Sequence, residues 1–327
     1  MTRRVGWGMI GCGQIAVDKM LPAMLAASNL ELVAVADPIA ERRALTGVEG
    51  YSSYHELLAD PRIEAVYIAL PTGMHVQAVL AAAAAKKDIL CEKPLGQNVR
   101  EVTQMLEAAE QNAVRLMTGY MSRFSDLFQQ ACRTVRDGTI GEVTFTYANF
   151  SYPALGPYPP GTPGGWRWTD PNGGGPLLDI GVYLAFGLRE LLEDQISTLN
   201  SRAVRTVAPE GSVADTNMAW TLTARGIPGV FAATFSHQEC RIILYGSKGK
   251  LEISDCFAQV PSGRLEVTVD GKTTVTEADP KLPHFDNYRR EVEHFSTAIL
   301  EHTAHQTDAA AALADAKLLE AMKGSPA

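Results

Sequence analysis

The stretch GMIGCGQIA, residues 8–16, decides the fold. It overlaps a short apolar run, VGWGMI (5–10), and places Gly11, Gly13 and Ala16 in the spacing G-x-G-x-x-A. The first glycine permits a tight turn, the second lets backbone amides approach a pyrophosphate, and the alanine allows a helix to pack closely on a strand. A glycine turn without a ligand is the alternative. The position between a strand and a helix favours a dinucleotide-binding βαβ unit.

The chain around this turn alternates apolar runs with helical patterns up to about residue 120. The runs are nearly continuous, which is typical of parallel strands covered on both faces. Besides the first run they are ELVAVA (31–36), AVYIAL (65–70), DILC (88–91) and VRLMTG (114–119). One helical pattern opens with Asn98 and carries Glu101 three residues later, close to a capping box. The alternation predicts a doubly wound parallel sheet of the Rossmann type.

The pattern changes in the second part of the chain. Residues 125–141 predict a helix, residues 142–152 alternate like a half-buried strand, and residues 153–176 form a loop rich in Pro and Gly. From about residue 196 strand patterns follow one another without helices between them, which predicts a meandering antiparallel sheet, and two helical patterns close the chain.

The length favours two domains, because 327 residues exceed the usual size of one. We expect a dinucleotide-binding Rossmann domain at 1–122. An α+β domain for substrate and oligomerisation is expected at 123–327, with the C-terminal helix able to pack back on the first domain.

The composition excludes some classes of protein. A formal net charge of −8 and the absence of long basic runs argue against nucleic acid as the main partner. No apolar run reaches the roughly 18 residues of a membrane helix, so no membrane association is expected. The five cysteines are scattered and form no CxxC, which indicates reduced thiols in a cytoplasmic protein.

The cofactor preference depends on the end of the second predicted strand. Asp37 stands where a carboxylate binds the adenosine 2′-hydroxyl, which favours NAD. Arg42 and Arg43 follow closely and are able to hold the 2′-phosphate of NADP, although a solvated helix face explains them equally. The sequence therefore predicts NAD or NADP, with a preference for NAD.

Further candidates stand where other strands end, at the edge that binds ligands in such sheets. Thr72 and His75 either contact the cofactor or cap the following helix. The expected cofactor-binding residues are Gly11, Gly13, Gln14, Ile15, Asp37, Arg42, Pro71, Thr72, His75, Glu92 and Lys93.

The segment LCEKPLG (90–96) ends a buried strand with charged residues and a proline. Lys93 is expected to emerge at the ligand-binding edge, with Pro94 fixing the turn after it. An ammonium group there can bind a reacting oxygen, stabilise negative charge and lower the pKa of a nearby acid. An exposed loop lysine is the alternative.

A second candidate pair lies in GGGPLLDIGVYLAFGLRELL (173–192). Asp179 and Tyr183 are four residues apart, so on a helix they share one face. A carboxylate beside a phenol is suited to moving a proton, and a hydrogen bond without chemistry is the alternative.

Together these motifs resemble the glucose–fructose oxidoreductase / inositol dehydrogenase (Gfo/Idh/MocA) family over nearly the whole chain. The resemblance implies a Rossmann domain, an open antiparallel sheet, and oxidation or reduction of sugars or polyols with NAD or NADP. It places the catalytic lysine at Lys93 and the sheet-domain aspartate at Asp179. Tyr183 stands where many members have histidine. That departure argues against inositol and favours the branch with aldose dehydrogenases and nucleotide-sugar 3-ketoreductases.

The resemblance also suggests residues that contact the substrate. Arg167 and Trp168 of GGWRWTD are expected to line a sugar pocket. Independently of the resemblance, Tyr152 stands in a proline-rich stretch and is expected to form part of a lid over the sugar. Core aromatics are the alternative for the tryptophan. Arg123 is either a substrate ligand or a structural partner of a carboxylate. The cluster of Glu301, His302 and His305 near the chain end is a weak candidate, and no metal is expected.

The leading interpretation is an NAD(P)-dependent sugar oxidoreductase that transfers a hydride between nicotinamide and a pyranose carbon. Tyr183 moves the hydroxyl proton, Lys93 lowers the pKa of that tyrosine, and Asp179 orients the substrate or assists. A reductase of a nucleotide-linked ketosugar and a non-catalytic NAD(P)-binding regulator are the alternatives. Family resemblance implies a homodimer or homotetramer through the C-terminal sheet.

Overall fold

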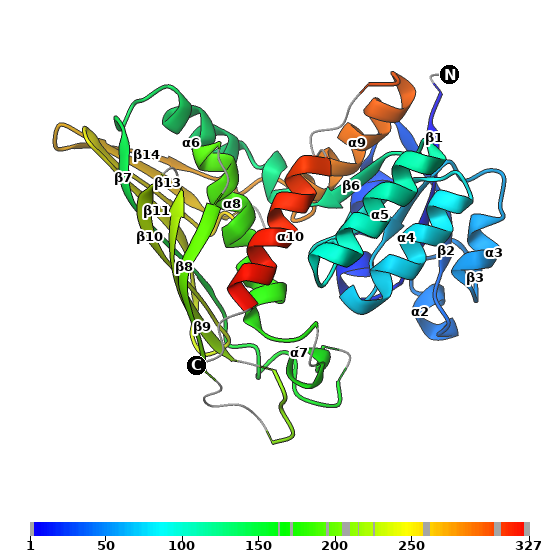
Figure 1. The fold of residues 1–327 in the computed structure, drawn as a ribbon. Coiled ribbons are helices and arrows are strands. Elements are labelled where there is room, and N and C mark those ends of the chain that lie inside the picture. Colours follow the sequence, from blue (N-terminus) through cyan, green and yellow to red (C-terminus); the bar gives the residue numbers. More distant parts are fainter. Residues whose placement is uncertain are drawn as a thin grey trace. The chain divides into compact units, whose positions relative to one another are not determined.

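The computed structural model describes residues 3–162, 164–170, 173–193, 196–204, 210–214, 216–224, 226–257, 262–303 and 309–323. The chain forms two compact units, which we describe separately (Figure 1). The first unit consists of Met1–Phe124 and Pro283–Leu313, and the second of Ser125–Leu282 and Ala314–Ala327.

The first unit contains a six-stranded sheet in the order β3-β2-β1-β4-β5-β6, with every pair parallel. Its strands are β1 (Val5–Ile10), β2 (Leu30–Ala36), β3 (Glu49–Tyr51), β4 (Ala65–Ile68), β5 (Asp88–Glu92) and β6 (Leu116–Gly119). The predicted Rossmann-type sheet is confirmed. Strand β3 was missed because it has three residues and two of them are exposed, so it shows no apolar run.

Helices connect these strands. They are η1 (Ala16–Met20), α1 (Leu21–Ala26), α2 (Ala40–Ala44), α3 (Tyr54–Leu58), η2 (Thr72–Met74), α4 (His75–Ala84), α5 (Val99–Asn112) and η3 (Met121–Phe124). Asn98 caps α5 as expected, because its side chain accepts the Glu101 N–H. The Glu101 carboxylate accepts the N–H of Gln97, one residue before the cap (2.8 Å).

Helix α9 (Asp286–Leu300) belongs to the first unit, which differs from the expected boundary after residue 122. Its apolar face packs on the core of the parallel sheet. Trp7 of β1 meets Phe295 edge to face at 5.8 Å, and the Trp7 indole N–H donates to Ser296 Oγ at 3.0 Å. Burial of these side chains explains why a segment so late in the chain joins the Rossmann unit.

The second unit contains an eight-stranded sheet in the order β14-β13-β12-β11-β7-β10-β9-β8. Its strands are β7 (Val143–Ser151), β8 (Ile196–Val204), β9 (Asn217–Ala224), β10 (Ile227–Thr234), β11 (Glu239–Gly246), β12 (Gly249–Ser254), β13 (Arg264–Val269) and β14 (Lys272–Glu277).

The expected fully antiparallel sheet needs one correction, because β7 and β10 are parallel. The strands β10 and β11 follow one another in the chain and are connected by a short loop. The earlier strand β7 lies between them in the sheet. Since β11 runs antiparallel to β7 and reverses the direction of β10, the β7–β10 pair must be parallel.

Helices cover one face of this sheet (Figure 1). They are α6 (Asp126–Arg136), η4 (Leu177–Gly181) and α8 (Val182–Leu192). The short helix α7 (Trp166–Thr169) precedes η4, and the last helix, α10 (Ala309–Lys323), begins in the first unit and ends in the second. Phe128 of α6 stacks on Phe186 of α8 at 5.6 Å between ring centroids. Within the described residues, no helix is both long and apolar enough to cross a membrane.

Candidate active site

The turn after β1 has the geometry that its glycines predict. Gly11 has a φ of +92°, and a Cβ at this position would lie 2.5 Å from the Ala69 carbonyl oxygen. Gly13 has no atom within 4 Å of an added Cβ, so its backbone is open to an approaching ligand. Gln14 and Ile15 begin the helical run that continues into η1. This turn is therefore suited to hold a pyrophosphate.

Asp37 braces the same turn from the end of β2. Its Oδ2 accepts the Cys12 N–H and its Oδ1 accepts the Ile39 N–H, both at 2.9 Å. Arg42 Nη1 lies 3.9 Å from Oδ2, and Arg43 donates to the Asp37 carbonyl at 2.6 Å. Both arginines therefore stand at the edge where an adenosine ribose would bind in a Rossmann fold.

The loop after β4 is joined to the turn after β5 by a buried histidine. His75 is 1% exposed, with Nδ1 3.1 Å from the Pro94 carbonyl and 3.2 Å from the Leu95 carbonyl, and Nε2 2.9 Å from the Leu70 carbonyl. Neither His75 nor Thr72 caps a helix through its side chain. His75 thus holds together two loops that border the expected cofactor edge, and Pro71 begins the η2 turn between them.

The end of β5 turns its acidic side chain inward. Glu92 is 9% exposed, and its Oε1 accepts the Tyr67 O–H at 2.6 Å. Its Oε2 accepts the backbone N–H of Lys93 at 3.2 Å. Burial raises the pKa of Glu92, while the charge of Lys93 and the Tyr67 hydrogen bond lower it. The carboxylate thus faces the interior, and the half-buried Lys93 follows it at the rim of the sheet.

In the second unit, Asp179 of η4 accepts hydrogen bonds from Arg167 and Tyr152. Its Oδ2 accepts Arg167 Nε–H and the Tyr152 O–H, both at 2.6 Å, and its Oδ1 accepts Arg167 Nη2–H at 3.1 Å. Burial and the Asp179 charge raise the pKa of Tyr152. Burial alone would lower the pKa of Arg167, but the Asp179 charge keeps it above its ordinary value. The expected residues Tyr152, Arg167 and Asp179 are thus brought together.

Aromatic rings fix the guanidinium of Arg167 further. Its Cζ lies 4.0 Å from the centroid of the Tyr158 ring and 4.6 Å from that of the Trp166 ring. Trp168 is 1% exposed; its indole N–H donates to the Tyr158 carbonyl, and its ring packs against Phe235. In the structure Trp168 therefore packs as a core aromatic, and its contact with substrate stays a prediction.

Tyr183 lies in the first turn of α8 and is 5% exposed. Its ring stacks on Phe257 at 5.3 Å with an interplanar angle of 28°, and it meets Phe150 at 5.9 Å. Asp179 precedes it in the π-helical turn η4, so both residues lie in one continuous helical run. This aromatic packing orients the phenol ring.

The remaining candidates differ in their setting. Arg123 lies in η3, is 7% exposed, and its charge acts on Glu291 and His294, which favours the structural alternative for it. His302 follows the end of α9, and His305 lies outside the described residues. Among the side chains that the structure describes, no group of three or more His, Cys, Asp or Glu is arranged to hold a metal.

One buried acid was missed in the sequence. Glu291 of α9 is 1% exposed and belongs to the same interior as Tyr67 and Glu92. A signal for it exists, because Glu291 is three residues after Tyr288 and four before Phe295, on the apolar stripe of its helix. A carboxyl group on such a stripe is unusual.

Comparisons with known proteins agree with this arrangement. Residues 5–120 match the oxidoreductase family with an NAD-binding Rossmann fold, and residues 128–252 match the Gfo/Idh/MocA C-terminal domain. The chain is 30% identical to D-xylose 1-dehydrogenase (NADP(+)) 2 of Haloferax volcanii, over 90% of this chain and 88% of that protein. It is also 30% identical to dTDP-3,4-didehydro-2,6-dideoxy-alpha-D-glucose 3-reductase of Saccharopolyspora spinosa, over 91% and 89%.

A solved structure shares the fold. Aldose-aldose oxidoreductase from Caulobacter crescentus superposes with a TM-score of 0.88 at 23% identity, covering 98% of this chain and 97% of that one. The matches to both parts of the chain and to full-length relatives establish that the chain belongs to the Gfo/Idh/MocA family of oxidoreductases.

Proposed function

We propose that this protein is an NAD(P)-dependent sugar oxidoreductase of the aldose dehydrogenase type, which transfers a hydride between nicotinamide and a pyranose carbon. The glycine turn at Gly11 and Gly13 is the observation that carries the proposal, because its open backbone fits a dinucleotide pyrophosphate. A relative with 30% identity over most of the chain is named a D-xylose dehydrogenase.

Tyr183 gives or takes the proton of the sugar hydroxyl in this proposal. Its ring is fixed by Phe257 and Phe150, so the hydroxyl position is defined before substrate binds. Lys93 supplies positive charge that favours the tyrosinate form and stabilises an oxygen that gains negative charge. Nicotinamide supplies the hydride chemistry, and the protein positions the reactants and moves the proton.

Asp179 acts as a positioning residue in our proposal, and we do not assign it the proton. Both of its carboxyl oxygens already accept hydrogen bonds from Arg167, and one also accepts the Tyr152 hydroxyl. A carboxylate next to a guanidinium is a weak base. Its role is to hold Arg167 and Tyr152 so that their remaining polar groups face a sugar in a fixed arrangement.

The cofactor in our proposal is NAD or NADP, with both accepted. The preference for NAD lacks support, because the D-xylose dehydrogenase relative is named for NADP. Asp37 uses both carboxyl oxygens on backbone N–H groups, so it is less free to bind ribose hydroxyls than the sequence suggested. Arg42 is 37% exposed beside it and is suited to a 2′-phosphate.

A reductase of a nucleotide-linked ketosugar is the second candidate, favoured by the relative from Saccharopolyspora spinosa. The diphosphate of such a substrate requires cationic partners. Arg167 is the only Lys or Arg among residues 137–188, and Asp179 neutralises it. This pairing favours an uncharged free sugar over a nucleotide-sugar. The comparisons lend no support to a non-catalytic regulator.

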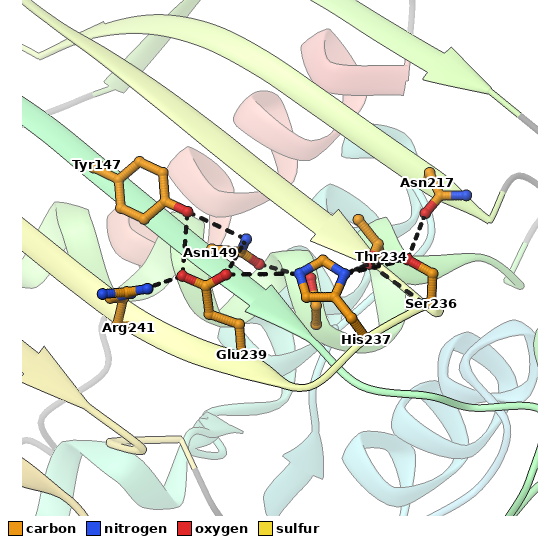
Figure 2. Close-up of polar contacts among 9 residues, drawn as sticks. Tyr147, Asn149, Asn217, Thr234, Ser236, His237, Glu239 and Arg241 are labelled. Carbon is orange, nitrogen blue, oxygen red and sulfur yellow. Dashed lines mark hydrogen bonds and ion pairs between the residues drawn. The ribbon is translucent and has the colours of Figure 1, made fainter.

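We also propose that the open face of the second sheet binds another copy of the chain. Phe145 and Tyr245 are paired across β7 and β11, with ring centroids 6.0 Å apart, and are 37% and 41% exposed. Figure 2 shows the polar centre of this face, where Glu239 accepts hydrogen bonds from Tyr147, Asn149 and Arg241. Fixed polar groups beside exposed aromatic rings are suited to a protein interface.

A cytoplasmic location completes the proposal. All five cysteines are free and buried, which suits a compartment that keeps thiols reduced.

The proposed function is tested by a substrate screen that follows reduced nicotinamide absorbance. D-Xylose and other free aldoses are expected to turn over with at least one of NAD and NADP, more efficiently than inositols or dTDP-sugars. Tyr183→Phe serves as the matched control, because it removes one hydroxyl and leaves the ring. Turnover confined to dTDP-ketosugars would establish the second candidate instead. Dinucleotide binding without any turnover would favour the regulator.

A further inference from the structure

A group of buried ionisable side chains lies in the first unit behind Lys93, and the proposed function does not use it. Glu92 accepts the Tyr67 hydroxyl and the Lys93 backbone N–H, as described above. Glu291 of α9 is a second acid in this interior and is 1% exposed. Two carboxyl groups that interact electrostatically inside an apolar core are unusual, because each charge is expensive to bury.

Burial disfavours a negative charge on Glu291 more than the positive charge of Arg123 favours one. Neither of its carboxyl oxygens forms a hydrogen bond with the part of the chain that the structure describes. The nearby backbone N–H of Tyr120, which slightly favours the charged form, already donates to the Thr118 carbonyl at 3.1 Å. Burial raises the pKa of Glu291 well above its ordinary value, and the charge of Glu92 raises it further. Glu291 is therefore the acid that keeps its proton.

The surroundings of Glu92 act in the opposite direction. The positive charge of Lys93, the Tyr67 O–H and the Lys93 N–H all stabilise the carboxylate, although burial raises its pKa. When the environments of two acids differ in this way, the acid with hydrogen-bond donors and a cation beside it has the lower pKa and ionises first.

The other groups that face this interior are one cation and two neutral side chains. Arg123 of η3 brings a cation toward Glu291, and Tyr288 of α9 interacts with Tyr67 as a neutral phenol. His294 of α9 has its pKa lowered by burial and by Arg123, so it is neutral at pH 7. The positive charge of Arg123 opposes the effect of burial on Glu291, but the pKa of Glu291 remains well above its ordinary value because burial outweighs that charge.

We propose that Glu92 is a positioning residue whose negative charge holds Lys93 as an ammonium ion. Glu291 is its protonated, uncharged partner, so that Glu92 is the ionised acid of the pair. The link to catalysis rests on the proposed function, because Lys93 acts there through its positive charge. The assignment of the proton to Glu291 does not depend on it.

Glu291 also destabilises the fold at neutral pH. The pKa of a glutamate in an unfolded chain is about 4.3, and folding raises the pKa of Glu291. Between these two values the unfolded state releases the proton while the folded state retains it, so stability falls as the pH rises through this window. A residue that lowers stability without structural need is a candidate for a functional role.

The proton assignment is tested with Glu291→Gln. We expect its urea midpoint to equal that of the unmodified protein near pH 4 and to exceed it progressively toward pH 8. The infrared band of a protonated carboxyl group should be present at pH 7, persist in Glu92→Gln and vanish in Glu291→Gln. Glu110→Gln, at an exposed position on α5, is the control and should change neither measurement. A midpoint difference between Glu291→Gln and the unmodified protein that stays constant from pH 4 to pH 8 would mean that folding does not raise the pKa of Glu291, and would overturn the assignment.

The positioning role is tested by the pH dependence of kcat/KM. Removing the Glu92 charge should move the alkaline limb about one unit or more toward lower pH, because Lys93 then loses its proton more easily. Glu291→Gln should move it far less, since it removes no charge. Tyr67→Phe should shift the limb in the same direction as Glu92→Gln and serves if that variant fails to fold. Equal shifts for both acids would overturn the proposal. If no sugar is turned over, the proposed function fails, while the infrared and urea results still decide the state of Glu291.

Discussion

Arg167 and Asp179 form a two-point ion pair in which Nε and Nη2 donate to the two carboxyl oxygens at 2.6 and 3.1 Å. The guanidinium is 15% exposed and the carboxylate 7%. Two bonds in one plane define direction as well as distance, and aromatic rings near the guanidinium restrict its rotation. The pair links the segment before η4 to the helical run that carries Tyr183, so its geometry bears directly on the proposed acid/base.

The first prediction separates positioning from proton transfer at Asp179. We expect Asp179→Asn to lower kcat/KM by about 10- to 100-fold and to destabilise the protein by about 1–3 kcal/mol, because Arg167 loses its buried partner. Arg167→Gln should produce a similar loss of activity. The double variant should be little worse than either single one, since the two residues act as a unit.

Kinetics and thermal unfolding of these variants provide the test. Tyr152→Phe is the matched control, because it removes one of the hydrogen bonds to Asp179 and leaves the ion pair. If Asp179 moved the proton itself, Asp179→Asn would abolish turnover while Arg167→Gln remained active.

The second prediction concerns cofactor choice at the end of β2. Asp37→Ser should raise the affinity for NADP relative to NAD by about tenfold, or 1.4 kcal/mol, because a carboxylate repels a 2′-phosphate. Both absolute affinities should fall, since Asp37 also accepts the Cys12 N–H of the glycine turn. Arg42→Ala should change the ratio in the opposite direction. Calorimetry with both dinucleotides gives the ratio, and an unchanged ratio in both variants would place the adenosine end elsewhere.

The sequence was sufficient for the fold wherever a pattern is local. The glycine turn, the apolar strands and the cap at Asn98 each depend on residues close together in the chain, and the structure confirms them. The parallel contact of β7 with β10 was missed because it depends on which distant strands become neighbours. The joining of α9 to the Rossmann unit depends likewise on a contact between Trp7 and Phe295.

In the candidate site, too, local features could be predicted from the sequence and long-range contacts could not. Sequence reasoning placed Glu92 and His75 at a strand edge, but it could not show which way each side chain turns. Glu92 points to the hydroxyl of Tyr67, and His75 faces carbonyl groups from two loops. The ion pair of Asp179 with Arg167 could not be predicted from the sequence either. Arg167 lies twelve residues before Asp179, across a loop rich in glycine and proline, so no helical spacing connects the two residues.

The third prediction tests the proposed interface between copies. Phe145→Lys should dissociate the oligomer, because a charge placed among exposed aromatic rings must be desolvated when two faces meet. Leu45→Lys is the control, since Leu45 is 67% exposed in the first unit and lies on no sheet. Light scattering at micromolar concentration measures the mass. A monomeric unmodified protein, or an unchanged mass for Phe145→Lys, would contradict the interface.

The last prediction concerns the proton itself. Tyr183→Phe removes one hydroxyl and preserves the stacking on Phe257, so cofactor affinity should barely change while turnover falls by about two to four orders of magnitude. Lys93→Met should also reduce turnover severely, because it removes the charge that favours the tyrosinate. The double variant should lose less than the sum of the two separate losses, since residues that act together are not additive. Steady-state rates with the best aldose provide the test. If Tyr183→Phe keeps near-normal turnover while Lys93→Met is inactive, another group must be the acid/base. Tyr183 would then only line the sugar pocket.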